Sequence, residues 1–242
     1  MMKFLMFVVL LYMEGSFAQD SGRAVQVSLA TVYSHNRIFR GALIWDAPIM
    51  AIGPNFTFYN IVSLGQGGLS IFKKIGNHQT ISIGLTAFDD NEPNGPVLTL
   101  EEREEDFKNQ RSSTFGTYLK YDFRFRQLIA ISLSYQKDLK RHNGSYLNSR
   151  ISTSIIPFIT LGFGGSLGDK KSNQYAYGPE GISGTGHIET FAGLMLPILP
   201  WRGRLILNYK RTKISKGRNA NADYVRGNKT NQNFSIIATW RL

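Results

Sequence analysis

The sequence contains no cysteine, which excludes a disulfide framework, a lipid anchor on cysteine and cysteine ligands for a metal. It also lacks any stretch of 18 uninterrupted apolar residues, so it offers no candidate for a transmembrane helix. Acidic residues are scarce, with 17 against 28 lysines and arginines. Eight of the 17 lie between Asp89 and Asp106, so the rest of the chain is strongly basic. A basic protein of this kind meets anionic surfaces.

The first residues have the pattern of a cleaved signal peptide. Lys3 precedes an apolar run over residues 4–13, and Ser16-Phe17-Ala18 fits the cleavage pattern of small residues. The apolar run is shorter than the roughly 20 residues that a membrane-spanning helix needs. We therefore expect a signal peptide over residues 1–18 and one exported domain over residues 19–242. Export argues against nucleic acid as a partner.

Hydrophobic and polar residues alternate along most of the exported part, which predicts an all-β fold. The pattern is clearest at the C-terminal end, where Phe234, Ile236, Ala238, Trp240 and Leu242 share one face, and Ser235, Thr239 and Arg241 share the other. Ile237 is the one apolar residue on the polar face. The candidate strands cover residues 23–33, 37–46, 50–60, 62–73, 80–89, 112–125, 127–138, 146–156, 158–168, 187–197, 202–214 and 231–242.

Connections between these strands are alternately long and short when they are counted back from the C-terminal end. Such alternation is typical of transmembrane β-barrels, which have short periplasmic turns and long outer loops. Aromatic residues near strand ends fit the two girdles at the membrane surfaces; they include Tyr33, Trp45, Phe56, Phe58, Phe88, Phe125, Tyr135, Trp201 and Trp240. We predict an antiparallel transmembrane barrel of about twelve strands. Ten strands with an N-terminal arm, or a soluble barrel, are the alternatives.

Several short segments resemble the MipA/OmpV family (MltA-interacting protein) of Gram-negative outer-membrane proteins. The resemblance rests on Arg37-Ile-Phe-Arg-Gly41 with Pro48 and Gly53-Pro54, on Leu64-Gly-Gln-Gly-Gly68, on Asn173-Gln-Tyr-Ala-Tyr-Gly178 and on the closing strand. It implies a non-enzymatic barrel of the outer membrane that scaffolds peptidoglycan-synthesising and lytic machinery. A murein hydrolase or synthase is then the expected protein partner.

Two other functions remain open. Charged residues on predicted inward positions, including Lys120, Asp122, Arg124 and Arg204, would line the path of a small-solute channel or plug it. Adhesion is the other, and only the resemblance to the MipA/OmpV family implies it.

No catalytic, cofactor or metal site is predicted. The four histidines fall in predicted connections or at strand ends without metal-ligand spacing. Asp89-Asp90, with the pair His142 and Asp138, is the nearest approach to a catalytic arrangement, and solvated loop acids explain it more simply. The acidic run Glu101–Asp106 has no calcium-loop spacing and is read as a solvated loop.

The segment from Trp201 to Thr230 is the most basic part of the chain. Its outer loop would lie at the same membrane face as lipopolysaccharide phosphates, which pair with arginine and lysine side chains. The candidate contacts with lipopolysaccharide are Lys213, Lys216, Arg218, Arg226 and Lys229. A hydrated loop with no ligand is the alternative reading.

Overall fold

The computed structural model describes residues 24–65, 68–88, 114–125, 128–140, 142–156, 158–199, 203–215, 217–225 and 227–241. The predicted signal peptide, residues 1–18, lies outside these ranges. Among the described residues, no helix is long and apolar enough to cross a membrane.

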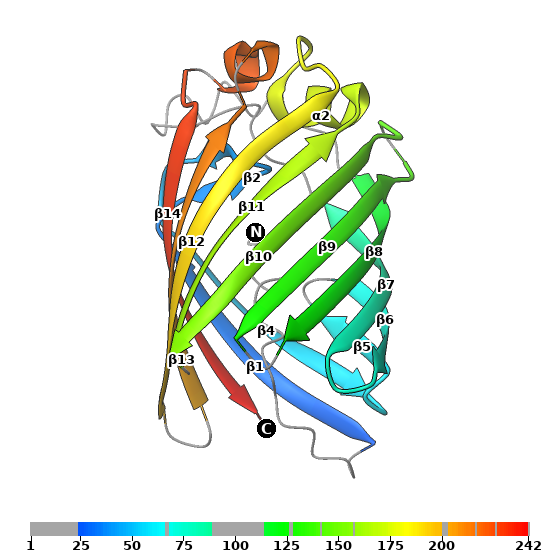
Figure 1. Cartoon of the computed structure of the whole chain (residues 1–242), viewed down its shortest axis with the longest axis vertical. Helices are drawn as coiled ribbons and strands as arrows, with labels where there is room; N and C mark the ends of the chain where they lie inside the picture. Colours follow the sequence, from blue (N-terminus) through cyan, green and yellow to red (C-terminus); the bar gives the residue numbers. More distant parts are fainter. Residues whose placement is uncertain are drawn as a thin grey trace.

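Twelve antiparallel strands form one closed barrel (Figure 1). They are β1 (Val25–Ser34), β4 (Ile49–Phe58), β5 (Val62–Gly65), β6 (Gly68–Ile75), β7 (Gln79–Phe88), β8 (Thr114–Phe125), β9 (Ile129–Asp138), β10 (Ser145–Ile156), β11 (Ile159–Gly168), β12 (Gly184–Leu199), β13 (Gly203–Ile214) and β14 (Thr230–Arg241). Each strand pairs with its sequence neighbours in the wall, and β1 pairs with β14 from Ser28↔Arg241 to Ser34↔Ser235. The closing strand is therefore where the C-terminal pattern predicted it.

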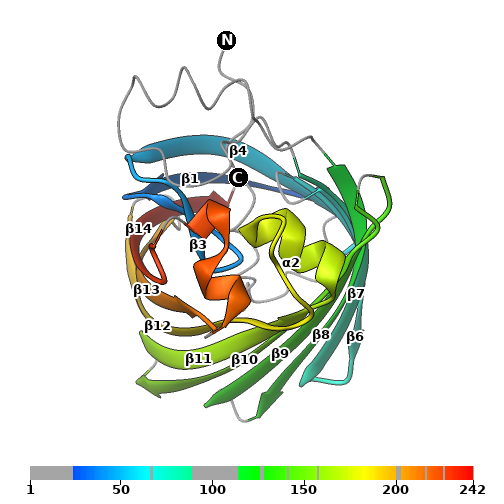
Figure 2. The same ribbon diagram turned by 90° about the horizontal axis from the view of Figure 1, so that it is seen from above.

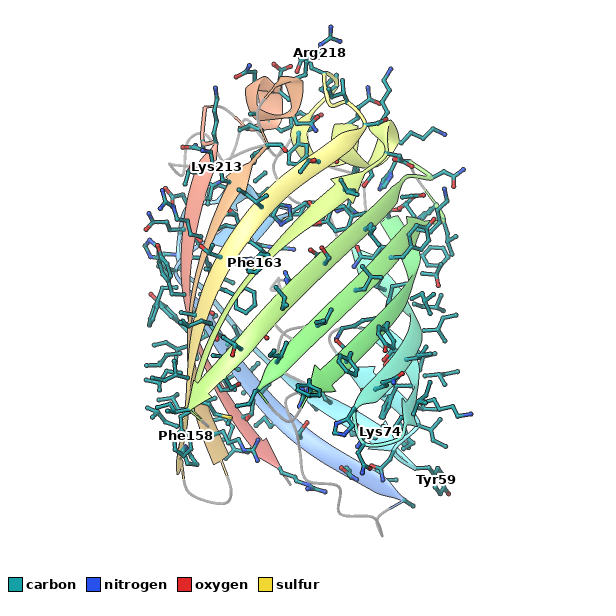
Figure 3. All side chains as sticks on the ribbon, viewed as in Figure 1. Tyr59, Lys74, Phe158, Phe163, Lys213 and Arg218 are labelled. Carbon is teal, nitrogen blue, oxygen red and sulfur yellow. The ribbon has the colours of Figure 1, made fainter. Side chains whose placement is uncertain are left out.

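Alternation along each strand decides which side chains face outward. On β9, Ile129, Ile131 and Leu133 are exposed on the outer face, whereas Ser132 and Ser134 face the lumen. The outward side chains are apolar around the wall, so its outer surface is an apolar belt. The lumen face is polar over most of its area, but Val32, Ile206 and Ile237 form a buried apolar cluster there, with Met195 packed against them. Exposed members of the belt include Ile81, Ile83, Leu85, Leu119, Ile131, Leu133 and Phe163; Figure 3 shows Phe163 on the outer surface. Large apolar side chains exposed all round a closed barrel need lipid around them, so this is the architecture of an outer-membrane barrel.

Aromatic side chains lie toward both ends of this belt. Tyr33 and Tyr135 face outward near one end, and Phe58 and Phe125 face outward near the other. This agrees with the predicted girdles. The side chains of Trp45 and Phe88, and Trp201 as a whole, lie outside the described parts of the chain.

The prediction that residues 37–46 form a wall strand is wrong. They form the separate hairpin β2 (Arg37–Phe39) and β3 (Ala42–Trp45), which pairs only within itself among the described residues. Arg40 and Gly41 turn the chain at the hairpin tip, with φ of 47° and 89°. Ile38, Phe39, Ala42, Leu43 and Ile44 are all buried, so the hairpin is covered on both faces. The even spacing of Phe39, Leu43 and Trp45 in the sequence does not tell a wall strand from such a hairpin.

The prediction of one strand over residues 62–73 is also wrong, and this error compensates for the first. The chain reverses between Gly65 and Gly68, which pair with each other at the ends of β5 and β6. Gly68 has φ of 97°, a conformation that glycine adopts readily. The count of twelve is therefore confirmed, although two of the predicted strands are assigned differently.

Long and short connections lie at opposite ends of the barrel, as predicted. The strands that flank residues 35–48, 89–113, 139–144, 169–183 and 215–229 meet these connections at the outer end. Those that flank residues 59–61, 76–78, 126–128, 157–158 and 200–202 meet them at the inner end. The connection between β5 and β6 is the exception, because it is short although these two strands meet it on their outer side. Strand β1 begins and strand β14 ends at the inner side, as an even number of strands requires.

Replacing Leu133 by arginine should lower the free energy of unfolding by about 2–4 kcal/mol, because the charge would face hydrocarbon near the middle of β9. Ser132→Arg on the same strand should lower the free energy of unfolding clearly less, since the new side chain enters the lumen opposite Asp122. Guanidinium titrations of protein folded into lipid vesicles would measure both. Equal losses for the two variants would contradict the assignment of the faces.

Candidate functional site

Three outer connections fold over and into the outer mouth of the barrel (Figure 2). They carry the β2–β3 hairpin, the helix α2 (Lys170–Tyr177), and the 3-10 helices η3 (Arg218–Asn221) and η4 (Asp223–Val225). Together with Ile214 of β13 they form one buried apolar cluster: Phe39, Ala42, Ile44, Ala176, Tyr177, Ile214, Ala220, Ala222 and Val225, with Tyr175 packed against it. We call the hairpin and these three helices the plug. The plug gives the outer mouth a small core of its own.

Helix α2 is fixed to the barrel wall through its N-cap. One carboxylate oxygen of Asp169 accepts a hydrogen bond from the Ser172 amide, at 2.8 Å, which satisfies a free N–H of the first helical turn. The other oxygen accepts from the Ser145 amide of β10, at 2.7 Å. A single aspartate thus starts the helix and holds it against the wall.

The hairpin tip enters the lumen at Gly41. The Gly41 carbonyl accepts hydrogen bonds from Thr212 Oγ1 of β13, at 3.2 Å, and Asn231 Nδ2 of β14, at 2.8 Å. A Cβ at Gly41 would lie 2.6 Å from the Cβ of His187 on β12, closer than any real contact. Only glycine fits here, because of both this approach and the positive φ.

Arg40 joins the hairpin to α2 and to the wall. Its Nη1 donates to Ser172 Oγ at 2.5 Å and to the Ser172 carbonyl at 3.3 Å, and its own carbonyl accepts from the Tyr177 hydroxyl at 2.8 Å. The guanidinium also stands over the ring of Tyr146 of β10, 4.4 Å from its centroid. This cation–π contact is strengthened because the site is shielded from water. Arg40 is the residue that holds three parts of the outer mouth together.

A layer of charged residues lies directly beneath the plug. Arg150 of β10 forms an ion pair through Nε with Glu189 of β12. His187 Nε2 is 3.7 Å from Glu189 Oε2, and its Nδ1 is 2.8 Å from Ser166 Oγ of β11. The prediction that every histidine lies in a connection or at a strand end is wrong for His187, which is buried inside the lumen. The spacing of His187 and Glu189, two residues apart and hence on one strand face, was the signal that could have found this layer.

Ser166, His187 and Glu189 contact one another in the order serine, imidazole, carboxylate, as in a catalytic triad. Their surroundings, however, fit a structural role. Ser166 is 4% exposed, and its Oγ already accepts the His187 amide at 3.0 Å. A nucleophilic serine has to be open to a substrate. Here the three side chains hold β11 to β12 behind the hairpin tip.

The lumen face of the wall is strongly basic. Register places seven basic side chains and three acidic ones on this face of the described strands: Lys74, Lys120, Arg124, Arg150, Arg204, Lys210 and Arg241, with Asp122, Asp138 and Glu189. Lys120 and Asp122 form an ion pair at 2.9 Å. The inward positions predicted for Lys120, Asp122, Arg124 and Arg204 are thus confirmed.

Lys210 is the basic residue nearest the charged layer. It pairs in register with Phe191 of β12 and Asn233 of β14, and it makes no hydrogen bond or ion pair with any described residue. Arg150, by contrast, is held by Glu189. Glu189 also interacts electrostatically with Lys210, without a direct ion pair, so Arg150 and Lys210 share one carboxylate.

The predicted pair of Asp138 and His142 does come together, in the connection between β9 and β10. His142 Nε2 is 3.5 Å from Asp138 Oδ2, and the imidazole stacks on Tyr175 of α2 with centroids 4.3 Å apart. Asp138 Oδ1 accepts the amides of Lys140, His142 and Asn143, so the carboxylate shapes the turn. Asp89-Asp90 and Glu101–Asp106 lie outside the described residues.

The proposed lipopolysaccharide contacts divide into two groups. Lys213, Arg218 and Lys229 are exposed at the outer end of the barrel, and Figure 3 shows Lys213 and Arg218 there. Lys216 and Arg226 lie outside the described residues. Lys213 lies on the outward face of β13, so it points toward lipid and not toward the lumen.

No family model matches the chain, and no curated protein matches it. The chain is similar to the solved NanC porin, with a TM-score of 0.47, 12% identity, and coverage of 89% of this chain and 100% of that chain. For the KdgM porin the TM-score is 0.41, with 10% identity and coverage of 89% and 98%. For OprD of Pseudomonas aeruginosa the values are 0.39, 11%, 90% and 66%. We draw no conclusion about function from likenesses this distant, and none of these matches supports the MipA/OmpV resemblance specifically.

Gly41→Ala should displace the hairpin tip while leaving the barrel folded, because the new methyl group would collide with His187. Hydrogen exchange in residues 37–45 should accelerate, with the wall strands unaffected. Gly76→Ala is the matched control, since Gly76 also has a positive φ, of 62°, but has no atom within 4 Å of a new Cβ. Equal effects of the two variants on the hairpin would contradict the contact.

Acid should loosen the connection that carries His142. Burial, together with the nearby Arg40 cation, lowers the pKa of His142 to about 4 from its ordinary 6.5. Between these values the unfolded loop binds a proton that the folded loop does not, so loop stability falls as the pH drops from about 6.5 to 4 and is constant above 6.5. Hydrogen exchange of α2 across this range would measure the effect. His142→Phe keeps a ring against Tyr175 and should abolish the dependence on pH.

Proposed function

We propose that this protein is a non-enzymatic outer-membrane channel that draws small anionic solutes into a basic lumen and is closed at its outer mouth by the plug. The observation that carries the proposal is the excess of basic over acidic side chains on the lumen face of the described strands. Rings of basic side chains select anions because they replace part of the hydration that a solute loses on entry.

Unpaired polar atoms on the lumen face support a lumen that contains water. Thr86 Oγ1 and Asn148 Oδ1 are buried and have no hydrogen-bond partner among the described residues. Buried polar groups in proteins are almost always hydrogen-bonded, and water is the partner that a polar lumen supplies. Basic side chains around such water give a positive potential that concentrates anions.

The plug supports a gated channel. The hairpin tip is held to the wall by the hydrogen bonds that Thr212 and Asn231 donate to the Gly41 carbonyl. The helices have wall contacts of their own, from Asp169 to the Ser145 amide and from Asn219 to the Thr185 carbonyl. The plug's own apolar cluster lets the hairpin and helices move together. Withdrawal of the tip would free both the lumen axis and the charged layer around Lys210.

A scaffold of the MipA/OmpV type is the second candidate. The observation that favours it is the packed apolar cluster across the outer mouth, because a barrel that only presents surfaces to envelope enzymes has no need of an open path. The partner would then be a murein hydrolase or synthase. Co-purification from crosslinked envelopes tests this candidate, and absence of any murein enzyme would remove it.

Planar-bilayer recordings test the channel. The intact protein should show low conductance with a reversal potential that favours anions in a KCl gradient. Replacing residues 37–45 by a short glycine-serine linker should raise the conductance, since this removes the part of the plug that enters the lumen.

Lys210→Gln in the linker variant should shift the reversal potential toward zero, because it removes a basic side chain from the lumen. Lys73→Gln is the matched control, because Lys73 is on the outward face of β6. No conductance from the linker variant, or an unchanged reversal potential after Lys210→Gln, would refute the anion channel.

A further inference from the structure

Four charged side chains lie on the lipid-facing surface of the described strands, and all four are basic: Lys73, Lys137, Arg211 and Lys213. Lys73 is alone near the inner end of β6. Lys137 donates to the Asn143 carbonyl at 2.7 Å and is satisfied within its own turn. Arg211 and Lys213 differ, because they stand two residues apart on one face of β13. They are the only pair of cations on this surface of the described wall.

The neighbours of this pair place it at the boundary between hydrocarbon and lipid headgroups. One register step toward the membrane centre, Tyr209 lies between Ala192 of β12 and Phe234 of β14. Aromatic side chains of this kind mark the interface. Arg211 lies between Thr190 and Gln232 in the next row, where side chains become polar.

Neither cation has a partner within the described chain. Arg211 and Lys213 make no hydrogen bond or ion pair with any described residue. The lipid-facing surface of the described strands carries no acidic side chain that could pair with them. At headgroup level the available anions are lipid phosphates, and an arginine fork binds two phosphate oxygens at once.

An open pocket lies beside the pair. It has a volume of about 350 Å³ and is lined by residues of the hairpin connection and of β13–β14: His35, Asn36, Leu43, Tyr209, Asn228, Thr230, Asn231, Gln232, Asn233 and Phe234. Thr230 and Gln232 are the register partners of Lys213 and Arg211. The outward part of the pocket therefore combines the Thr230 hydroxyl and the Gln232 amide with the rings of Tyr209 and Phe234, next to the two cations. The amides of Asn231 and Asn233 face the lumen and already bond the Gly41 and Asn36 carbonyls. Sugar hydroxyls and amides are suited to such a lining.

We propose that Arg211 and Lys213 bind the phosphate of an outer-leaflet phosphoglycolipid, whose sugar occupies the pocket beside β14. Arg211 supplies the bidentate contact, and Lys213 supplies a second charge farther out. Exposed Arg218 and Lys229 stand at the same end and would add charge above the site. The proposal is independent of whether the lumen conducts.

Binding of lipid A to the full mature protein in detergent tests the site, with native mass spectrometry as the readout. The intact protein should retain phosphorylated lipid A, and Arg211→Gln with Lys213→Gln should weaken retention by at least about tenfold, as loss of charge-assisted hydrogen bonds implies. Lys73→Gln with Lys137→Gln is the matched control and should retain the lipid as the intact protein does. Heat-modifiable migration on gels would verify that each variant is folded.

Three further probes separate the sources of phosphate. Dephosphorylated lipid A, phosphatidylglycerol and inorganic phosphate should each bind much more weakly than phosphorylated lipid A. Equal retention of dephosphorylated lipid A would overturn the phosphate site. Equal retention of phosphatidylglycerol or inorganic phosphate would overturn the glycolipid assignment, and unchanged retention by the double variant would overturn the role of the two cations.

Discussion

Backbone hydrogen bonding inside a hydrocarbon layer is the constraint on which this structure depends. Each N–H and C=O left without a partner there costs several kcal/mol, so strands can cross a membrane only as a closed sheet. Pairing of β1 with β14 closes the sheet, and the alternation of side chains then divides the molecule into an apolar exterior and a mostly polar interior. The basic lumen and the basic pair on β13 both follow from this division, on opposite faces of one wall.

The two sets of basic residues differ in what surrounds them. Inside the lumen, Arg150 and Lys120 have acidic partners. On the outer face, Arg211 and Lys213 have none within the described chain, and lipid begins one row below them. These different surroundings are why we propose a solute path for the first set and a lipid headgroup for the second.

Much of the wall could be predicted from the sequence because its rule is local. The period of two identified β14 and β9, and the alternation of loop lengths identified the inner and outer ends. The errors arose where the local rule is shared by two structures. Residues 37–46 alternate as a wall strand does, and the glycines at 65–68 fit a bent strand as well as a turn. The plug could not be predicted, because Gly41 meets His187 and Asn231 across long stretches of chain.

Closure of the barrel also bears on how the protein assembles. Ser34 pairs with Ser235, so the seam joins the first and last of the described strands. Contacts between segments so distant in sequence form slowly, because the chain loses the entropy of closing a long loop before the contact contributes any stabilisation. Before β14 is in place, β1 and β13 each have an edge of unpaired backbone N–H and C=O groups, which can pair with other chains. An incomplete barrel is therefore prone to pair with other chains until β14 is in place.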